Sequence, residues 1–254
     1  MAVATSPAGL FNIVTAPPRM RADRLVGVAA TYFPGQELSD DYLWEKLCAA
    51  EAAAERALRV FFCPTEIVPQ GSDEVPTTRW IEEPGYDYTP DMFSGDRWGL
   101  IETRQRPIIS VTSMVFAYPG LTGNSFTVPP DWFRVDKKFG RINLVATTSV
   151  MTMPLNSFIL SVLGGGRMVP LMLQIRYRAG LTDAATKYPD LVNIIYKMAI
   201  LSVLEDQFVP GSGSISADGL SQSLSFDAAK YQEGIDRQID ALRDAIHGPR
   251  AMVC

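Results

Sequence analysis

The single histidine decides which nucleophilic chemistries this sequence can support. A Ser-His-Asp or Cys-His arrangement would have to use His247, because the chain contains no other histidine. No Gly-x-Ser-x-Gly motif is present to expose a nucleophilic serine. His247 falls in the last turn of a predicted C-terminal helix, where a cation interacts favourably with the helix dipole. We therefore expect no nucleophilic catalysis and interpret the protein as a non-enzyme.

Two pairs of neighbouring carboxylates, Asp40-Asp41 and Glu82-Glu83, do not match an acid–base site. Adjacent residues point apart on any regular element, so neither pair can converge by itself. Two carboxylates brought together across the fold, as in a glycosidase, are left open by the sequence. The run Gly164-Gly165-Gly166 lacks the Lys-Ser/Thr ending of a phosphate-binding loop and is interpreted as a turn. No cofactor is predicted.

The composition is that of a globular protein with an acidic balance. The 254 residues are 47% hydrophobic and 20% charged, with a net charge of −5, which favours a folded core and disfavours general binding to nucleic acid. No apolar run is long enough for a membrane span, and no secretion signal is recognised, so we expect no membrane partner. The cysteines are odd in number and lack metal-ligand spacing, which predicts neither a disulfide framework nor a metal site: Cys48, Cys63 and Cys254.

An aromatic-rich region is the one feature that leaves a carbohydrate-binding or hydrolytic module open. Five aromatic residues stand within about 50 positions: Trp80, Tyr86, Tyr88, Trp98 and Trp132. They suit a stacking surface for sugars or bases, although aromatic residues in small sheets usually belong to the core. Loss of glycan binding on Trp80→Ala or Trp132→Ala would favour this alternative.

Two amphipathic helices at the C-terminal end are predicted to organise the fold. The first begins near Pro189 and ends before Pro210, with apolar residues at three- and four-residue steps: Leu191, Ile194, Ile195, Met198, Leu201 and Leu204. The second begins near Asp227 and ends at Gly248, a candidate left-handed cap, with a comparable stripe: Tyr231, Ile235, Ile239, Leu242 and Ile246. Both stripes predict core-facing helices.

The opposite face of the second helix carries Asp236, Asp240 and Asp244, one turn apart. Like charges at this spacing destabilise a helix slightly, and the Glu233–Arg237 pair offsets them in part. Two interpretations stay open. The stripe is either an ordinary solvated face or an acidic surface turned towards a polyanion or a basic partner.

The fold class predicted is α+β. Residues 1–38 form an N-terminal arm, and Ser39 caps a helix over 39–63 that packs on the two C-terminal helices of 188–248. The intervening residues, 64–187, form a large antiparallel β-rich insertion. Its strands are predicted at 78–82, 100–103, 108–118, 125–128, 132–135, 141–146 and 169–177. The clearest hairpin is 132–144 with Gly140 in its turn, while 148–163 is either a short helix or an exposed loop.

The segment between the two C-terminal helices, residues 211–226, carries a recognisable motif, and we call this segment the joint. It contains four apolar residues among serines and glycines, Ile215, Leu220, Leu224 and Phe226, which are expected to pack in a hairpin around Asp218-Gly219 or on a neighbouring chain. The order of helix, Ser214–Ser225 and a helix that opens with Lys230-Tyr231 resembles the C-terminal part of head–tail adaptor (connector) proteins of tailed bacteriophages. The resemblance covers about a quarter of the chain.

The resemblance implies a structural virion protein at the neck, assembled in the host cytoplasm. Subunits would form a homo-oligomeric ring, typically a dodecamer, beneath the portal protein and above a stopper or tail-completion protein, with DNA passing through the channel without sequence-specific binding. It further implies that the four apolar residues of the joint contact a neighbouring subunit and that Asp236, Asp240 and Asp244 face the channel. The C-terminal tail of 249–254, with Gly248 before it, would reach the portal: Gly248, Pro249, Arg250, Ala251, Met252, Val253 and Cys254. Another tail-completion, neck or baseplate component is the nearest alternative.

Overall fold

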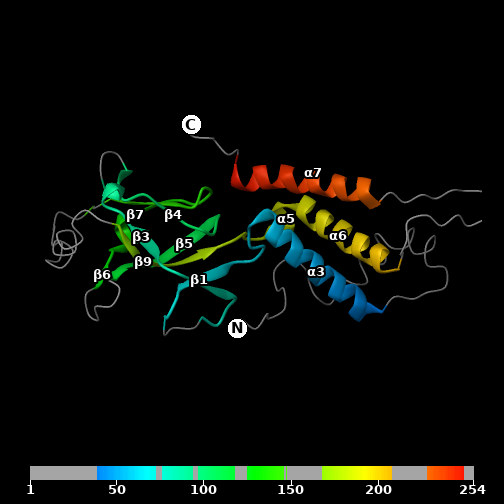
Figure 1. The fold of residues 1–254 in the computed structure, drawn as a ribbon, viewed down its shortest axis with the longest axis horizontal. Coiled ribbons are helices and arrows are strands. Elements are labelled where there is room, and N and C mark those ends of the chain that lie inside the picture. Colours follow the sequence, from blue (N-terminus) through cyan, green and yellow to red (C-terminus); the bar gives the residue numbers. More distant parts are fainter. Residues whose placement is uncertain are drawn as a thin grey trace, which may run out of the picture. The chain divides into compact units, whose positions relative to one another are not determined.

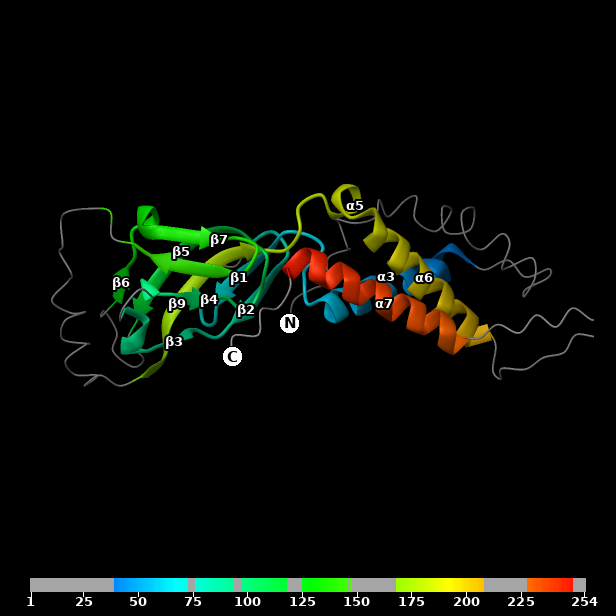
Figure 2. The same ribbon diagram turned by 90° about the horizontal axis from the view of Figure 1, so that it is seen from above.

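The computed structural model describes residues 39–72, 76–93, 97–117, 125–145, 147, 168–207 and 228–248. Most of them belong to one of two compact units, a helical unit formed by 39–59 and 183–245, and a β-rich unit formed by 60–182 (Figures 1 and 2). The predicted N-terminal arm, residues 148–163, the joint and the tail after Gly248 lie outside the described residues.

The helical unit contains α3 (Asp40–Leu58), the short α5 (Ala184–Lys187), α6 (Pro189–Gln207) and α7 (Ala228–His247). Ser39 caps α3 as predicted, because its hydroxyl accepts a hydrogen bond from the Tyr42 amide at 3.3 Å. The helix ends at Leu58, before the expected boundary at residue 63, because Arg59 adopts a left-handed conformation with φ of 56° and donates its amide to the Glu55 carbonyl.

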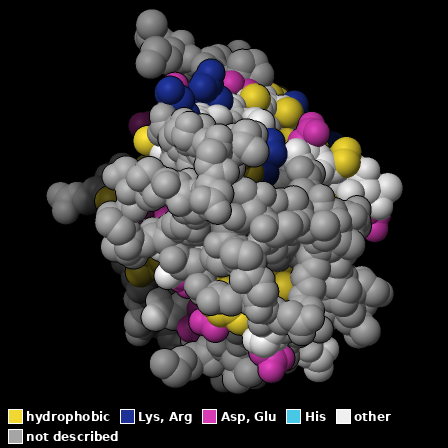
Figure 3. Space-filling model, turned by 90° about the vertical axis from the view of Figure 1, so that its right-hand side faces the viewer, with side chains coloured by type: hydrophobic (Ala, Val, Ile, Leu, Met, Phe, Trp, Pro, Cys, Tyr) yellow, Lys and Arg dark blue, Asp and Glu magenta, His cyan; other side chains and the backbone are white. Residues whose placement is uncertain are grey.

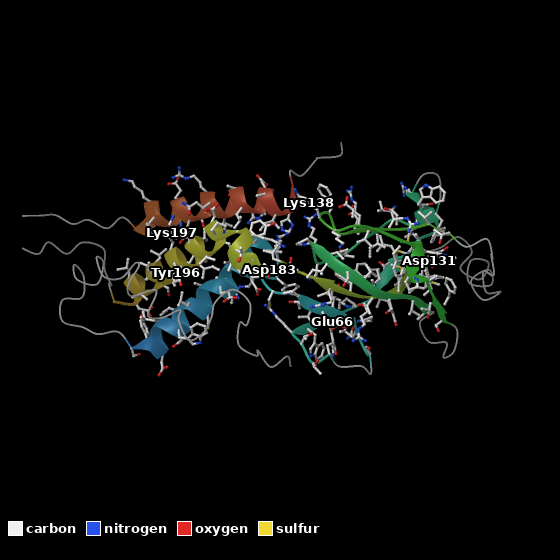
Figure 4. All side chains as sticks on the ribbon, turned by 180° about the vertical axis from the view of Figure 1, so that it is seen from behind. Glu66, Asp131, Lys138, Asp183, Tyr196 and Lys197 are labelled. Carbon is white, nitrogen blue, oxygen red and sulfur yellow. The ribbon has the colours of Figure 1, made fainter. Side chains whose placement is uncertain are left out.

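Helices α3, α6 and α7 lie side by side, although α3 is far from the other two in sequence (Figure 1). The buried faces of α6 and α7 carry the predicted apolar stripes. The buried apolar residues include Leu43, Leu47 and Leu58 on α3, Leu191, Ile194 and Ile195 on α6, and Ile235, Ile239 and Leu242 on α7. Two polar contacts connect them. Arg243 donates to the Ala57 carbonyl at 2.7 Å, and Lys197 of α6, labelled beside Tyr196 in Figure 4, donates to Gln238 at 3.0 Å.

The larger sheet of the β-rich unit has the order β2-β1-β9-β5-β6, with β3 also paired to β9. Its strands are β1 (Thr65–Pro69), β2 (Trp80–Glu83), β3 (Tyr86–Tyr88), β5 (Ile108–Ala117), β6 (Ser125–Thr127) and β9 (Val169–Ala179). Pairing is antiparallel except between β1 and β2, which are parallel. The long strand β9 is therefore central, and Glu66 of β1, labelled in Figure 4, accepts from Arg176 of β9 at 2.6 Å.

A smaller sheet has the order β4-β8-β7, with β4 (Ile101–Glu102), β7 (Phe133–Asp136) and β8 (Arg141–Leu144). The predicted hairpin is confirmed, since β7 and β8 pair antiparallel around a turn in which Gly140 has a φ of +70°. The short 3-10 turns η2 (Pro90–Phe93) and η4 (Pro130–Trp132) lie between β3 and β4 and between β6 and β7, so each follows a strand of the larger sheet and precedes one of the smaller sheet. The core of this unit is formed by Ile67, Met114, Ile142, Leu173 and Tyr177 with their neighbours.

The α+β fold class is confirmed, with one N-terminal and two C-terminal helices around a β-rich insertion. All seven predicted strands are present, with ends shifted by at most two residues, while β1 and β3 were not predicted. The insertion is antiparallel as predicted, apart from the pairing of β1 with β2, which run parallel.

Candidate functional site

The acidic stripe is placed on the solvent side of α7. Asp236, Asp240 and Asp244 are all exposed, opposite the buried stripe of the same helix. Asp240 accepts from Arg243 at 2.8 Å, and Asp236 accepts from Gln232 at 2.8 Å. The face is therefore partly compensated, and α7 keeps an acidic balance of four Asp and Glu against three Lys and Arg residues. In Figure 3, Lys and Arg side chains gather near the top of the face drawn, whereas Asp and Glu side chains are spread from top to bottom.

The joint residues Ile215, Leu220, Leu224 and Phe226, and the tail residues from Pro249 to Cys254, lie outside the described residues. Gly248 is described. It follows the last residue of α7 with a φ of +77°, as predicted for a left-handed cap.

A polar contact ties the start of α3 to the end of α6, close in sequence to the joint. Asp206 accepts from the Tyr42 hydroxyl at 3.0 Å and forms an ion pair with Lys46. The lysine and tyrosine hydrogen bonds lower the pKa of Asp206, and the Asp206 hydrogen bond raises the pKa of Lys46. This contact connects α3 with α6 near the end of α6.

The β-rich unit contains a polar cluster in which Glu83 and Tyr177 are buried, Tyr86 is half-buried and Arg104 is exposed. One Glu83 oxygen, Oε2, accepts from the hydroxyls of Tyr86 at 3.0 Å and Tyr177 at 3.1 Å. The two hydroxyls lie 3.2 Å apart. Arg104 lies over the Tyr86 ring at 4.2 Å and donates to the carbonyls of Pro84 and Gly85. The cluster joins β2, β3, β9 and the loop after β4.

Burial controls the electrostatics of this cluster. Desolvation raises the pKa of Tyr177 far above its ordinary range, and desolvation also raises the pKa of Tyr86. Glu83 is only 6% exposed, and its second oxygen, Oε1, has no hydrogen-bond partner among the described residues. Both phenols stay protonated at neutral pH and act as hydrogen-bond donors. We interpret the cluster as a structural connection between strands.

The prediction that the side chains of Glu82 and Glu83 point apart is confirmed. Glu82 is exposed and Glu83 is buried, as adjacent positions of one strand require. The burial of Glu83 against Tyr86 and Tyr177 was missed, because the partner on β9 is 94 positions away and no local signal connects the two.

Among the described residues, only two of the five predicted aromatic residues, Tyr88 and Trp132, belong to a row of rings in contact. Trp98 is 55% exposed and stands in a turn, whereas Trp80 on β2 and Trp132 on η4 are half-buried. The rings in contact form a row in which neighbouring centroids lie 6.2–6.4 Å apart, from Phe93 through Tyr88, Phe116 and Phe126 to Trp132. Four of these five rings are half-buried, which fits packing more closely than ligand stacking.

Within the part of the chain that the structure describes, no group of three or more His, Cys, Asp or Glu residues is arranged to hold a metal ion. Cys48 and Cys63 are both free and half-buried, and burial raises the pKa of the Cys48 thiol. No described helix is both long and apolar enough to span a membrane.

No protein-family model and no curated protein matches the chain. Two solved structures align with nearly all of it at 14% identity. One is described as the neck of an empty gene transfer agent particle with C6 symmetry, covering 92% of this chain and 94% of the other with a TM-score of 0.41. The second is from the virion of a native gene transfer agent particle, covering 100% and 97% with a TM-score of 0.45. Both TM-scores are below 0.5, so these likenesses do not establish a shared function.

Proposed function

We propose that this protein is a structural component of the neck of a phage-like particle, in the role of a head–tail adaptor. The observation that carries the proposal is the helical unit itself. One helix from before the β-rich insertion packs with two helices from after it, and α6 and α7 flank the joint that carries the Ser214–Ser225 motif. The resemblance to head–tail adaptors rests on that same order of helix, joint and helix.

In this role the subunits form a ring, typically of twelve copies, beneath a portal protein and above a stopper or tail-completion protein. The helical unit builds the ring. The joint residues Ile215, Leu220, Leu224 and Phe226 contact a neighbouring subunit. The acidic face with Asp236, Asp240 and Asp244 lines the channel, where repulsion keeps DNA mobile. That the protein performs no catalysis remains an expectation from its sequence.

The tail provides the first test. A variant lacking residues 249–254 loses co-purification with the portal ring, whereas a control in which the same six positions carry a Gly/Ser sequence separates loss of contacts from loss of length. Undiminished portal binding by the truncated protein contradicts the assignment of the tail.

Electron microscopy of the protein mixed with a portal tests the proposal as a whole. We expect a ring on the portal, and a pure protein that is monomeric or weakly associated until the portal is added, because the ordering of arms and joints is offset only by the interface. A stable monomer that ignores the portal contradicts the adaptor role. Binding to another tail or baseplate protein instead would support the nearest alternative.

A further inference from the structure

The turn of the β7–β8 hairpin gathers positive charge. Lys137, Lys138, Phe139 and Gly140 form the turn, and Lys137, Lys138 and Phe139 are exposed. Arg106 lies against it, because a Cβ added at Gly140 would be 3.0 Å from the Arg106 Cβ. We call Arg106, Lys137, Lys138 and Phe139 the hairpin tip.

The backbone of the hairpin tip is held firmly. Ile108 donates its amide to the Lys137 carbonyl at 2.7 Å. Thr103 donates both its amide, at 2.8 Å, and its hydroxyl, at 2.9 Å, to the Gly140 carbonyl. These contacts join the turn to the loop between β4 and β5. The exposed Lys137 and Lys138 and the half-buried Arg106 therefore stand on a pre-organised backbone, and a partner would order only side chains.

Among the described residues, the cations of the hairpin tip form no ion pair, and the nearest carboxylate in sequence, Asp136, accepts a hydrogen bond from the Phe139 amide at 3.3 Å. Neighbouring arginines are already engaged, since Arg141 pairs with Glu102 at 3.0 Å and Arg104 binds the Glu83 cluster. The Phe139 ring is 38% exposed, and the Arg141 guanidinium lies 5.8 Å from its centroid.

The charge of the surrounding sequence points the same way. Residues 97–145 contain seven Lys and Arg and three Asp and Glu, a net of +4, inside a chain whose net charge is −5. The rest of the chain therefore carries −9. An acidic chain that places three cations without ion pairs around one turn is organised for an anionic partner, because clustered charge rather than total charge determines phosphate binding.

We propose that the hairpin tip binds the phosphate backbone of duplex DNA. Two of the three cations are lysines, which act as mobile point charges and do not require the fixed geometry of an arginine–carboxylate fork. Duplex DNA presents one phosphate charge about every 1.7 Å along its axis, so a partner in motion always offers the tip a contact. The inference rests on the proposed function, in which DNA passes through the ring, and adds to it the surface that touches the DNA.

Three contacts give weak, sequence-independent and strongly salt-dependent binding. The test measures fluorescence anisotropy of a short labelled duplex with the full-length protein between about 50 and 200 mM salt. Each phosphate contact contributes about 0.9 to the slope of log K against log salt, so the slope of the triple variant R106Q/K137Q/K138Q should fall by about 2–3. The matched control R56Q/R97Q/R178Q removes the same charge from three exposed arginines elsewhere and should lower the slope by less than about 1.

Portal binding measured on the same proteins separates this inference from the proposed function. A lower slope in the triple variant with intact portal binding supports both. If the triple variant has a lower salt slope but the unmodified protein never binds a portal, the result supports DNA binding by the hairpin tip and contradicts the adaptor role. Equal slopes in the two triple variants, or no binding of the unmodified protein at about 50 mM salt, overturn the inference. Loss of portal binding or of self-association with an unchanged DNA slope also overturns it, and makes the hairpin tip a protein-docking surface.

Discussion

Replacing Tyr177 by Phe tests whether the polar cluster stabilises the β-rich unit. The Tyr177 hydroxyl donates to Glu83 at 3.1 Å and accepts from the Gln105 amide at 3.2 Å, and the side chain is fully buried. Removing the hydroxyl takes a donor from a buried carboxyl group that already has one unsatisfied oxygen, and leaves the Gln105 amide without that acceptor. A hydrogen bond to a charged group contributes about 1.5–3 kcal/mol, and an orphaned buried partner costs about 1–3 kcal/mol. Because the energy of the lost hydrogen bond and the cost of the orphaned partner overlap, we expect a loss of about 2–4 kcal/mol in the free energy of unfolding.

Tyr88→Phe is the matched control, since Tyr88 is half-buried and its hydroxyl has no hydrogen-bond partner among the described residues. This change should cost less than about 0.5 kcal/mol. Denaturant unfolding followed by tryptophan fluorescence reports mainly on the β-rich unit, because Trp80, Trp98 and Trp132 belong to it and only Trp44 belongs to α3. If the Tyr177 and Tyr88 variants unfold at the same denaturant concentration, the cluster contributes no stability and the reasoning fails.

Three further predictions concern single contacts. Asp206→Asn should destabilise the helical unit at neutral pH. Because the pKa of Asp206 is lowered in the folded protein, the difference in the free energy of unfolding between the variant and the unmodified protein should shrink as the pH falls below the ordinary pKa of 3.8. A difference that persists unchanged in acid would contradict the ion pair. Arg243→Ala should lower the opening free energy of the helices, measured by hydrogen exchange, by about 1–2 kcal/mol, because it removes the hydrogen bond to the Ala57 carbonyl of α3. The control Arg237→Ala, at an exposed residue, should lower it by less than about 0.5 kcal/mol. Equal losses in the two variants would refute a role for the hydrogen bond to α3. Gly180→Ala should lower the free energy of unfolding by more than about 2 kcal/mol in thermal unfolding, because the φ of Gly180 is +114° and a Cβ would meet the Cys63 carbonyl at 2.6 Å. Gly71→Ala is the control and should cost about 1 kcal/mol, since Gly71 has a positive φ and open space around it. A larger cost for Gly71→Ala than for Gly180→Ala would be inconsistent with this packing.

The helical unit could be predicted because its signals are local and repeated. Ser39, Pro189 and Gly248 each mark a helix end by a mechanism confined to one turn, and the apolar stripes identify the buried faces. The end of α3 was misplaced because Arg59 takes a left-handed conformation that arginine rarely adopts, and the sequence carries no glycine there to signal it. Strand prediction succeeded for similar reasons, since runs of β-branched residues stand between clear turn signals.

The two missed strands show the limit of local patterns. β1 has only five residues and ends in Pro69, and β3 is the three-residue stretch Tyr86–Tyr88, so neither run is long enough to establish an alternating period. Both strands are defined by their pairing with β9, which lies about 80 or more positions later. The parallel pairing of β1 with β2 likewise depends on how the connection between them returns, which the order of residues does not specify.

The two charged surfaces show the same limit of local patterns. The acidic stripe of α7 was recognised in the sequence, whereas the hairpin tip was not. The acidic stripe was visible because Asp236, Asp240 and Asp244 share one helix and one spacing. The hairpin tip was not visible as a unit, because Arg106 joins Lys137 and Lys138 only when the loop after β4 is hydrogen-bonded to the turn. A net charge of −5 then argued against nucleic-acid binding for the whole chain, although phosphates respond to the local arrangement of cations. A charge sum over the sequence therefore disfavours a broad basic surface, and it does not exclude a small one built from residues about 30 positions apart.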